Sequence, residues 1–144
     1  MTLVRATREL LAPRADVWAF VAEPYHLSDW WPGVSGVEPD RRGLAPGARW
    51  KLITTPQSGS PLSAFLRPAV AGGTLLVIDV RPPERVHLQL VNDRIDAVLT
   101  LEEAAADRTR ATLDVEGAWL RVNRSLPRKA LARLHALVQT AASL

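Results

Sequence analysis

The chain has 144 residues, of which 47% are apolar and 23% charged, as is usual for one globular domain. It contains no cysteine, which excludes a disulfide framework and a thiolate metal site. The net charge of +3 comes from arginines scattered among acidic residues. No nucleic-acid-binding motif accompanies them, so we expect no nucleic-acid partner.

We expect a single domain over residues 1–144, located in the cytoplasm, with no integral membrane segment. The longest weakly polar run, residues 69–78, has about half of the ~20 residues that a membrane-spanning helix needs. Near the N-terminus, Arg5, Arg8 and Glu9 interrupt the apolar residues, which is not the pattern of a secretory signal.

The N-terminal part is predicted to form a strand, two short helices and a second strand. Residues 2–11 alternate in polarity, as a half-buried strand does. Pro13 suits the first turn of a helix, which then runs to about residue 22. A second helix follows over residues 25–31, and a strand over residues 34–40.

Further strands are predicted where apolar and polar side chains alternate. Short turns separate the last four of them, so the sheet should be an antiparallel meander. Residues 55–61 are a loop rich in proline, serine and glycine. Residues 63–71 fit either a strand or a lid over a pocket. The predicted strand segments are 48–52, 74–80, 86–90, 95–102 and 112–119.

A long helix is predicted over residues 125–142. Ser125 can cap its first turn, and Pro127 lies early enough to cost no intrahelical hydrogen bond. At 1.5 Å per residue such a helix spans about 27 Å, enough to cross a small sheet. We expect the sheet to curl around it and to leave an apolar pocket. The predicted apolar stripe is Leu126, Ala130, Leu134, Leu137 and Ala141, and it is widened by Leu131 and Val138.

A basic run surrounds the start of this helix. Two interpretations stay open: a solvated helix face, or a patch that faces an anion or a membrane surface. The run comprises Arg121, Arg124, Arg128, Lys129 and Arg133.

The three histidines, His26, His87 and His135, share no metal-ligand spacing, so we expect neither a metal site nor a cofactor. No glycine-rich loop precedes a helix, and no serine lies in a nucleophile elbow. The alternation of its strand turns His87 toward solvent. His135 flanks the helix stripe as a boundary residue, and His26 lies near the expected cavity mouth as a surface residue.

Acidic side chains in the predicted strands occupy the polar positions of the alternation, so we place them on the wet outside of the sheet. A carboxylate there lacks the burial that shifts a pKa toward neutrality, and no catalytic residue can be named. These residues are Asp79, Asp96, Asp114 and Glu116.

The chain contains five tryptophans. Trp18 should face the core. Trp31, Trp50 and Trp119 are candidates for lining a pocket, because large rings give wide apolar contact at little entropic cost. Simple packing in the core is the alternative for each of them.

A set of short motifs resembles the START-like (SRPBCC) superfamily, particularly its polyketide cyclase/dehydrase-type bacterial members. The motifs are Ala12-Pro13 after the first strand, Val17-Trp18, Leu27, and Trp30 with Pro32. The resemblance implies an α+β helix-grip fold: a curved antiparallel sheet of six to seven strands around a long C-terminal helix, with two short helices after the first strand. It also implies a hydrophobic ligand cavity and a structural role for Trp30 as a plug in the core. Residues 55–72 depart from the pattern.

We therefore expect a protein that binds a small hydrophobic or amphipathic molecule, such as a lipid, polyketide or aromatic metabolite, between sheet and helix. The alternative is a polyketide cyclase or dehydratase in the same cavity, with a histidine moving a proton. A third reading is a filled core without a cavity. The sequence leaves the ligand's identity and the oligomeric state open. The candidate lining residues are Trp31, Trp50, Leu52, Leu88, Leu99, Val115, Trp119, Leu134 and Leu137.

Overall fold

The computed structural model describes residues 2–54, 73–118 and 122–142. The two segments 55–61 and 63–71 of the prediction lie outside this part of the chain, as does Trp119. The described elements follow the predicted order: β1 (Thr2–Leu10), α1 (Arg14–Ala22), a 3₁₀ turn (Pro24–His26), α2 (Leu27–Trp30), β2 (Val34–Glu38), β3 (Arg49–Thr54), β4 (Gly73–Arg81), β5 (Arg85–Leu90), β6 (Ile95–Ala105), β7 (Arg108–Gly117) and α4 (Leu126–Ala142).

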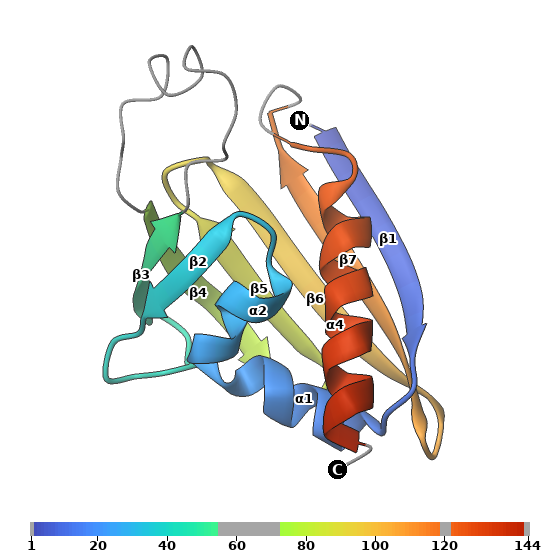
Figure 1. Ribbon diagram of the computed structural model, residues 1–144. Coiled ribbons are helices and arrows are strands. Elements are labelled where there is room, and N and C mark those ends of the chain that lie inside the picture. The colour runs from blue at the N-terminus through green and yellow to red at the C-terminus, as the bar shows by residue number, and fades with distance from the viewer. Residues whose placement is uncertain (1, 55–72, 119–121, 143–144) are drawn as a thin grey trace.

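The strands form one seven-stranded antiparallel sheet in the order β1-β7-β6-β5-β4-β3-β2. Every pair from β2 to β7 joins strands that are consecutive in sequence, which confirms the predicted meander. The first strand forms one edge of the sheet and pairs with β7 along its whole length, from Thr2 opposite Gly117 to Leu10 opposite Thr109. The sheet curves, and α4 lies along its concave side beside β7 and β1 (Figure 1).

Strict alternation gives the sheet an apolar inner face. In β6, residues 95, 97, 99 and 101 are buried while their neighbours 96, 98 and 100 are partly exposed. The same period holds in β7, where the inner row runs from Thr109 to Gly117. Because successive side chains of a strand point to opposite faces, each strand contributes its apolar residues to one core.

The two short helices cover one end of the concave side (Figure 1). Pro13 is extended and directly precedes α1, which buries Val17 and Val21. The predicted second helix is split, because its first residues form the 3₁₀ turn and only Leu27–Trp30 is α-helical. The chain leaves α2 through Gly33, whose φ of +89° is a conformation that favours glycine.

The C-terminal helix has the predicted place and packs against β1, β7, α1 and α2. Its buried stripe is rotated slightly from the predicted one: Ala130, Leu131, Leu134 and Val138 are buried, whereas Leu126 and Leu137 are half-buried. The hydroxyl of Ser125, the residue expected to cap the helix, donates to Asn123 Oδ1 at 2.7 Å. This bond connects Ser125 to the segment before the helix.

Two polar contacts fix the ends of the sheet. Thr109 is fully buried, and its hydroxyl donates to the carbonyl oxygen of Ala12 at 2.8 Å, where β1 turns into α1. At the other end, the Asp40 carboxylate accepts backbone N–H groups of Arg42 and Arg49, each at 2.9 Å. These two bonds hold the connection between β2 and β3.

Candidate functional site in the apolar interior

The predicted lining residues that the structure describes lie in the buried core or against it. They come from β3, β5, β6, β7, α4 and the residue that follows α2, so the fold brings side chains from five elements and one connection into one cluster. Leu137 packs against this cluster from its edge. The fully or nearly buried members are Trp31, Trp50, Leu52, Leu88, Leu99, Val115 and Leu134.

The position of α4 divides the inner face of the sheet into two parts. Among the described elements, α4 contacts β1 and β7, and α1 contacts β6 and β7, whereas no described helix comes comparably close to β3, β4 or β5. The inner rows of these three strands are therefore the part of the sheet that lies away from α4 (Figure 1). The buried residues of these rows are Trp50, Leu52, Leu75, Val77, Val86 and Leu88.

The described interior contains few polar groups. Thr109 is the one polar or charged residue there that is buried, and its hydroxyl is used by Ala12. The indole N–H of Trp50 donates to the carbonyl oxygen of Gly43 at 2.9 Å, and this bond fixes the orientation of the Trp50 ring. The indole N–H of Trp30 is enclosed and has no hydrogen-bond partner among the residues that the structure describes. Binding in such an interior would come mainly from removal of apolar surface from water.

The histidines lie on separate elements. His87 lies on the outer face, as predicted, with Nε2 2.9 Å from Asp96 Oδ1 on the neighbouring strand. His135 is half-buried on α4. His26 is more than a surface residue, because its Nδ1 lies 2.8 Å from the carbonyl oxygen of Phe20 and its ring stacks on Phe20 at 4.1 Å. His26 thus links the 3₁₀ turn to α1.

The strand carboxylates lie on the outer face, and several pair with basic side chains. Asp114 binds Arg5 through two contacts, Nε to Oδ1 at 2.6 Å and Nη2 to Oδ2 at 3.0 Å. The hydrogen bond and the charge of Asp114 raise the pKa of Arg5 above its ordinary value. Asp79 lies 3.3 Å from Arg81. These carboxylates serve the outer face and do not point into the core.

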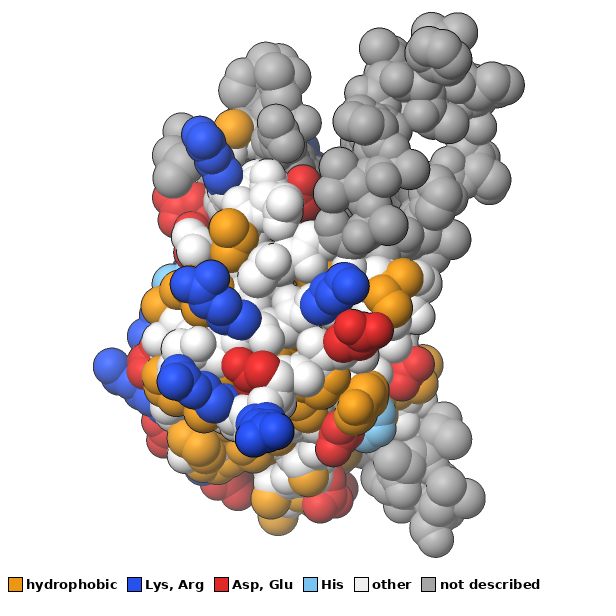
Figure 2. Space-filling model, turned by 90° about the vertical axis from the view of Figure 1, so that its left-hand side faces the viewer, with side chains coloured by type: hydrophobic (Ala, Val, Ile, Leu, Met, Phe, Trp, Pro, Cys, Tyr) orange, Lys and Arg blue, Asp and Glu red, His pale blue; other side chains and the backbone are white. Residues whose placement is uncertain are grey.

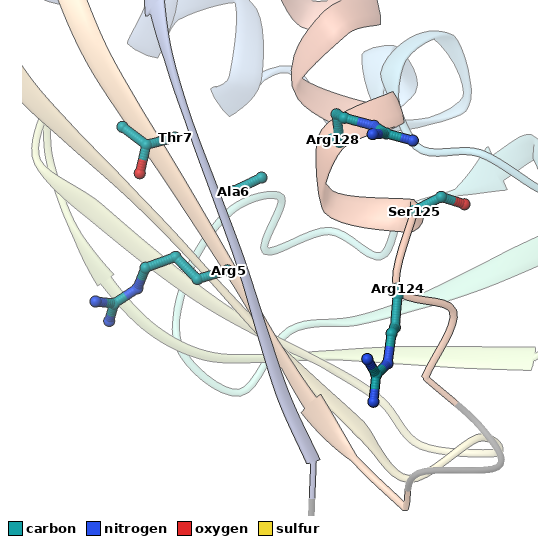
Figure 3. A pocket seen from close by; sticks show the side chains of 6 residues that line it. All are labelled: Arg5, Ala6, Thr7, Arg124, Ser125 and Arg128. Atoms are coloured by element: carbon teal, nitrogen blue, oxygen red, sulfur yellow. The ribbon is translucent and has the colours of Figure 1, made fainter.

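A hollow of about 490 Å³ lies at the free edge of β1 beside the start of α4. Arg5, Ala6, Thr7, Arg124, Ser125 and Arg128 line it (Figure 3). Arg5 and Thr7 project from one side of β1, whereas Arg124 and Arg128 come from the other side and point in different directions (Figure 3). The guanidinium groups therefore do not converge on one point, and Arg5 is already paired with Asp114.

Basic and acidic side chains are intermixed on the described surface that Figure 2 shows. Figure 2 shows the side of the molecule that forms the left of Figure 1, and basic and acidic side chains alternate there with apolar ones. The basic run is exposed where the structure describes it, as a solvated helix face requires, at Arg124, Arg128, Lys129 and Arg133. Arg121 lies outside the described residues. Each helix in the described part of the chain is too short or too polar to cross a membrane.

Sequence reasoning did not identify two features of the interior. Thr109 could have been found, because counting back in steps of two from Leu113 puts it on the inner face. The unpaired indole N–H of Trp30 left no trace in the sequence, since hydrogen-bond partners depend on neighbours from other elements. The sequence placed Trp30 correctly as a buried residue.

No protein-family model matches the chain, and no curated protein resembles it in sequence. Solved structures do resemble it. Protein NE0264 of Nitrosomonas europaea has a TM-score of 0.68 at 16% identity, covering 96% of this chain and 95% of that one. XoxI of Bacillus cereus has a TM-score of 0.71 at 10% identity, covering 99% of each chain.

A third similar structure is a norcoclaurine synthase point mutant from Thalictrum flavum, in complex with a transition-state analogue. It has a TM-score of 0.65 at 14% identity and covers 98% of this chain and 96% of its own. Likeness at these identities shows the fold alone. The chain shares with these structures the helix-grip fold, a curved seven-stranded antiparallel sheet with a C-terminal helix and two short helices after the first strand.

Proposed function

We propose that the protein binds a small hydrophobic or amphipathic molecule, such as a lipid, polyketide or aromatic metabolite, between the sheet and α4. The observation that carries this proposal is the placement of α4 against β1 and β7, away from the apolar inner rows of β3, β4 and β5. A ligand seated against these rows would touch Trp50, Leu52 and Leu88 on one side and the α4 stripe on the other.

The chemistry of the described interior supports an uncharged ligand body. Burying apolar surface contributes about 25 cal/mol per Å², whereas a buried charge needs a partner. No charged side chain of the described residues is buried, so none is available as that partner. If the ligand has a charged headgroup, that group would remain outside the apolar interior, near exposed side chains.

Catalysis by a cyclase or dehydratase is the rival function, and it needs two or more polar groups that converge on one buried point. The described groups do not converge in this way. His87 lies on the outer face, His26 is bonded to a backbone carbonyl, and the buried Thr109 hydroxyl is used by Ala12. We therefore place binding before catalysis, although one similar structure is that of a synthase.

Native mass spectrometry of freshly purified protein tests the proposal, together with thermal shifts for a panel of long-chain fatty acids, aromatic polyketides and alkylnaphthalenes. A ligand at 100 times its Kd stabilises the folded state by about 2.7 kcal/mol, which raises Tm by several degrees in a domain of this size. We expect a co-purifying mass or such a shift for at least one class. Repeated empty preparations with no shift from any class would contradict the proposal.

A further inference from the structure

The indole N–H of Trp30 is the one buried side-chain donor that lacks a hydrogen-bond partner among the described residues. Trp30 is 2% exposed and ends α2, a single turn of helix that packs against β2 and α4. Its ring meets that of Trp31 edge to face, with centroids 5.7 Å apart and planes at 78°. The unpaired donor thus lies within the core, beside a predicted lining residue.

Burial of an unpaired N–H is unfavourable, because the group has lost its water and gained nothing in exchange. Trp50, which is as deeply buried as Trp30 at 2% exposure, has its indole N–H satisfied: it donates to the carbonyl oxygen of Gly43 at 2.9 Å. The contrast singles out Trp30, and an unsatisfied group in a native interior calls for an explanation.

We infer that the Trp30 indole N–H is the polar anchor of the interior, and that the bound molecule carries a neutral oxygen acceptor such as a ketone, ester or ether. This inference rests on the proposed function and narrows its ligand class. An indole nitrogen only donates, so the ligand must supply the acceptor. A carboxylate fits less well, because no basic side chain of the described residues is buried to balance its charge.

The acceptor has to displace neighbouring apolar side chains, since Nε1 of Trp30 is enclosed. Trp31 is the neighbour whose ring contact with Trp30 is defined, so binding should disturb both indoles together. A ligand that fills the interior without an acceptor should leave the Trp30 N–H unbonded. A comparison of ligands with and without an acceptor therefore distinguishes a hydrogen bond to Trp30 from simple occupation of the interior.

The test compares two probes of nearly equal shape, 2-acetylnaphthalene and 2-ethylnaphthalene, whose Kd values are each corrected for the probe's water-to-octanol partitioning. The ketone has one carbonyl acceptor that the hydrocarbon lacks. We expect the wild-type protein to prefer the ketone by about 5–10-fold, the worth of one ordinary hydrogen bond. Trp30→Phe should abolish this preference and keep the hydrocarbon affinity, while Trp18→Phe, on the half-buried Trp18 of α1, should keep both.

A second measurement on the wild-type protein makes the inference independent of whether Trp30→Phe folds. In a ¹⁵N–¹H spectrum, the assigned Trp30 indole resonance should move downfield on saturation with the ketone and stay nearly in place with the hydrocarbon. An equal ketone preference in wild type and Trp30→Phe, or an unmoved indole resonance at ketone saturation, would overturn the inference while the proposed function stands. If neither probe binds and the native mass spectra are empty, the proposed function fails and the inference fails with it.

Discussion

Thr109 and Ala12, 97 positions apart in the chain, are joined by a buried hydrogen bond of 2.8 Å from the hydroxyl of Thr109 to the carbonyl oxygen of Ala12. Thr109 begins the inner row of β7, opposite Leu10, and Ala12 lies where β1 gives way to α1. The bond therefore fixes the corner from which the two short helices extend over the interior.

Replacement of Thr109 by valine should destabilise the protein by about 1–3 kcal/mol. Valine has nearly the same shape but no hydroxyl, so the Ala12 carbonyl loses a donor that water cannot replace in the core. The free energy of unfolding, from urea titration, measures the effect. Thr112→Val is the matched control on the outer face of the same strand, where we expect a change within about 0.5 kcal/mol. Equal effects of the two substitutions would show that the corner bond has no special role.

Leu134→Ala should destabilise the protein by about 2–5 kcal/mol, because Leu134 is 0% exposed and its removal leaves a cavity. Leu137→Ala, one turn further along α4, should cost less because that side chain is only half-buried. Thermal or urea unfolding of the two variants gives the comparison. A larger loss for Leu137→Ala would mean that the buried stripe of α4 faces differently.

Acid should weaken the connection between β2 and β3 through Asp40. The backbone N–H groups of Arg49 and Arg42 hold the pKa of the Asp40 carboxyl below its ordinary value of 3.8. A lowered folded-state pKa gives stability that is present above the unfolded value and is lost as pH falls through the folded pKa. Asp40→Asn should therefore lower the urea midpoint of unfolding at pH 6. The difference in midpoint between the variant and the wild-type protein should become smaller as the pH falls below about 3.8. A constant difference across this range would contradict the assignment.

Leu88→Trp should impair ligand binding, because the added ring would occupy the space inside β5 that the proposed ligand needs. Leu76→Trp is the matched control on the neighbouring strand β4, where Leu76 pairs with Gln89 and alternates with the buried Leu75 and Val77. The Kd for 2-ethylnaphthalene should rise at least tenfold in the first variant and stay within about twofold in the second, since a tenfold change needs only ~1.4 kcal/mol. Equal binding by both variants, with folding confirmed by circular dichroism, would place the ligand elsewhere.

The fold could be predicted from sequence because its signals are local. Alternation in β6 and β7 marks the inner face residue by residue, and Pro13, Pro24 and Gly33 mark where the short helices begin and end. The 3₁₀ turn was missed because 3₁₀ and α-helical turns share the same residue preferences over a few positions.

The interior could be predicted only in outline. Burial of Trp50, Leu88 and Leu134 follows from periodicity, but contacts between distant elements do not. The pairing of His26 with the Phe20 carbonyl and the isolation of the Trp30 donor depend on how α1, α2 and α4 meet. The slight rotation of the α4 stripe toward Leu131 has the same origin, since the apolar arc of this helix is wider than the face that packs.

Isotope-filtered NOE spectroscopy tests the central claim most directly, with 2-ethylnaphthalene bound to protein labelled at leucine and valine methyl groups. Binding between sheet and helix predicts NOEs from the probe to the buried Leu88, Leu99, Val115 and Leu134. NOEs at saturation that reach only the exposed Leu3, Leu11 and Val91 would contradict it, because the probe would then lie on the outside of the molecule.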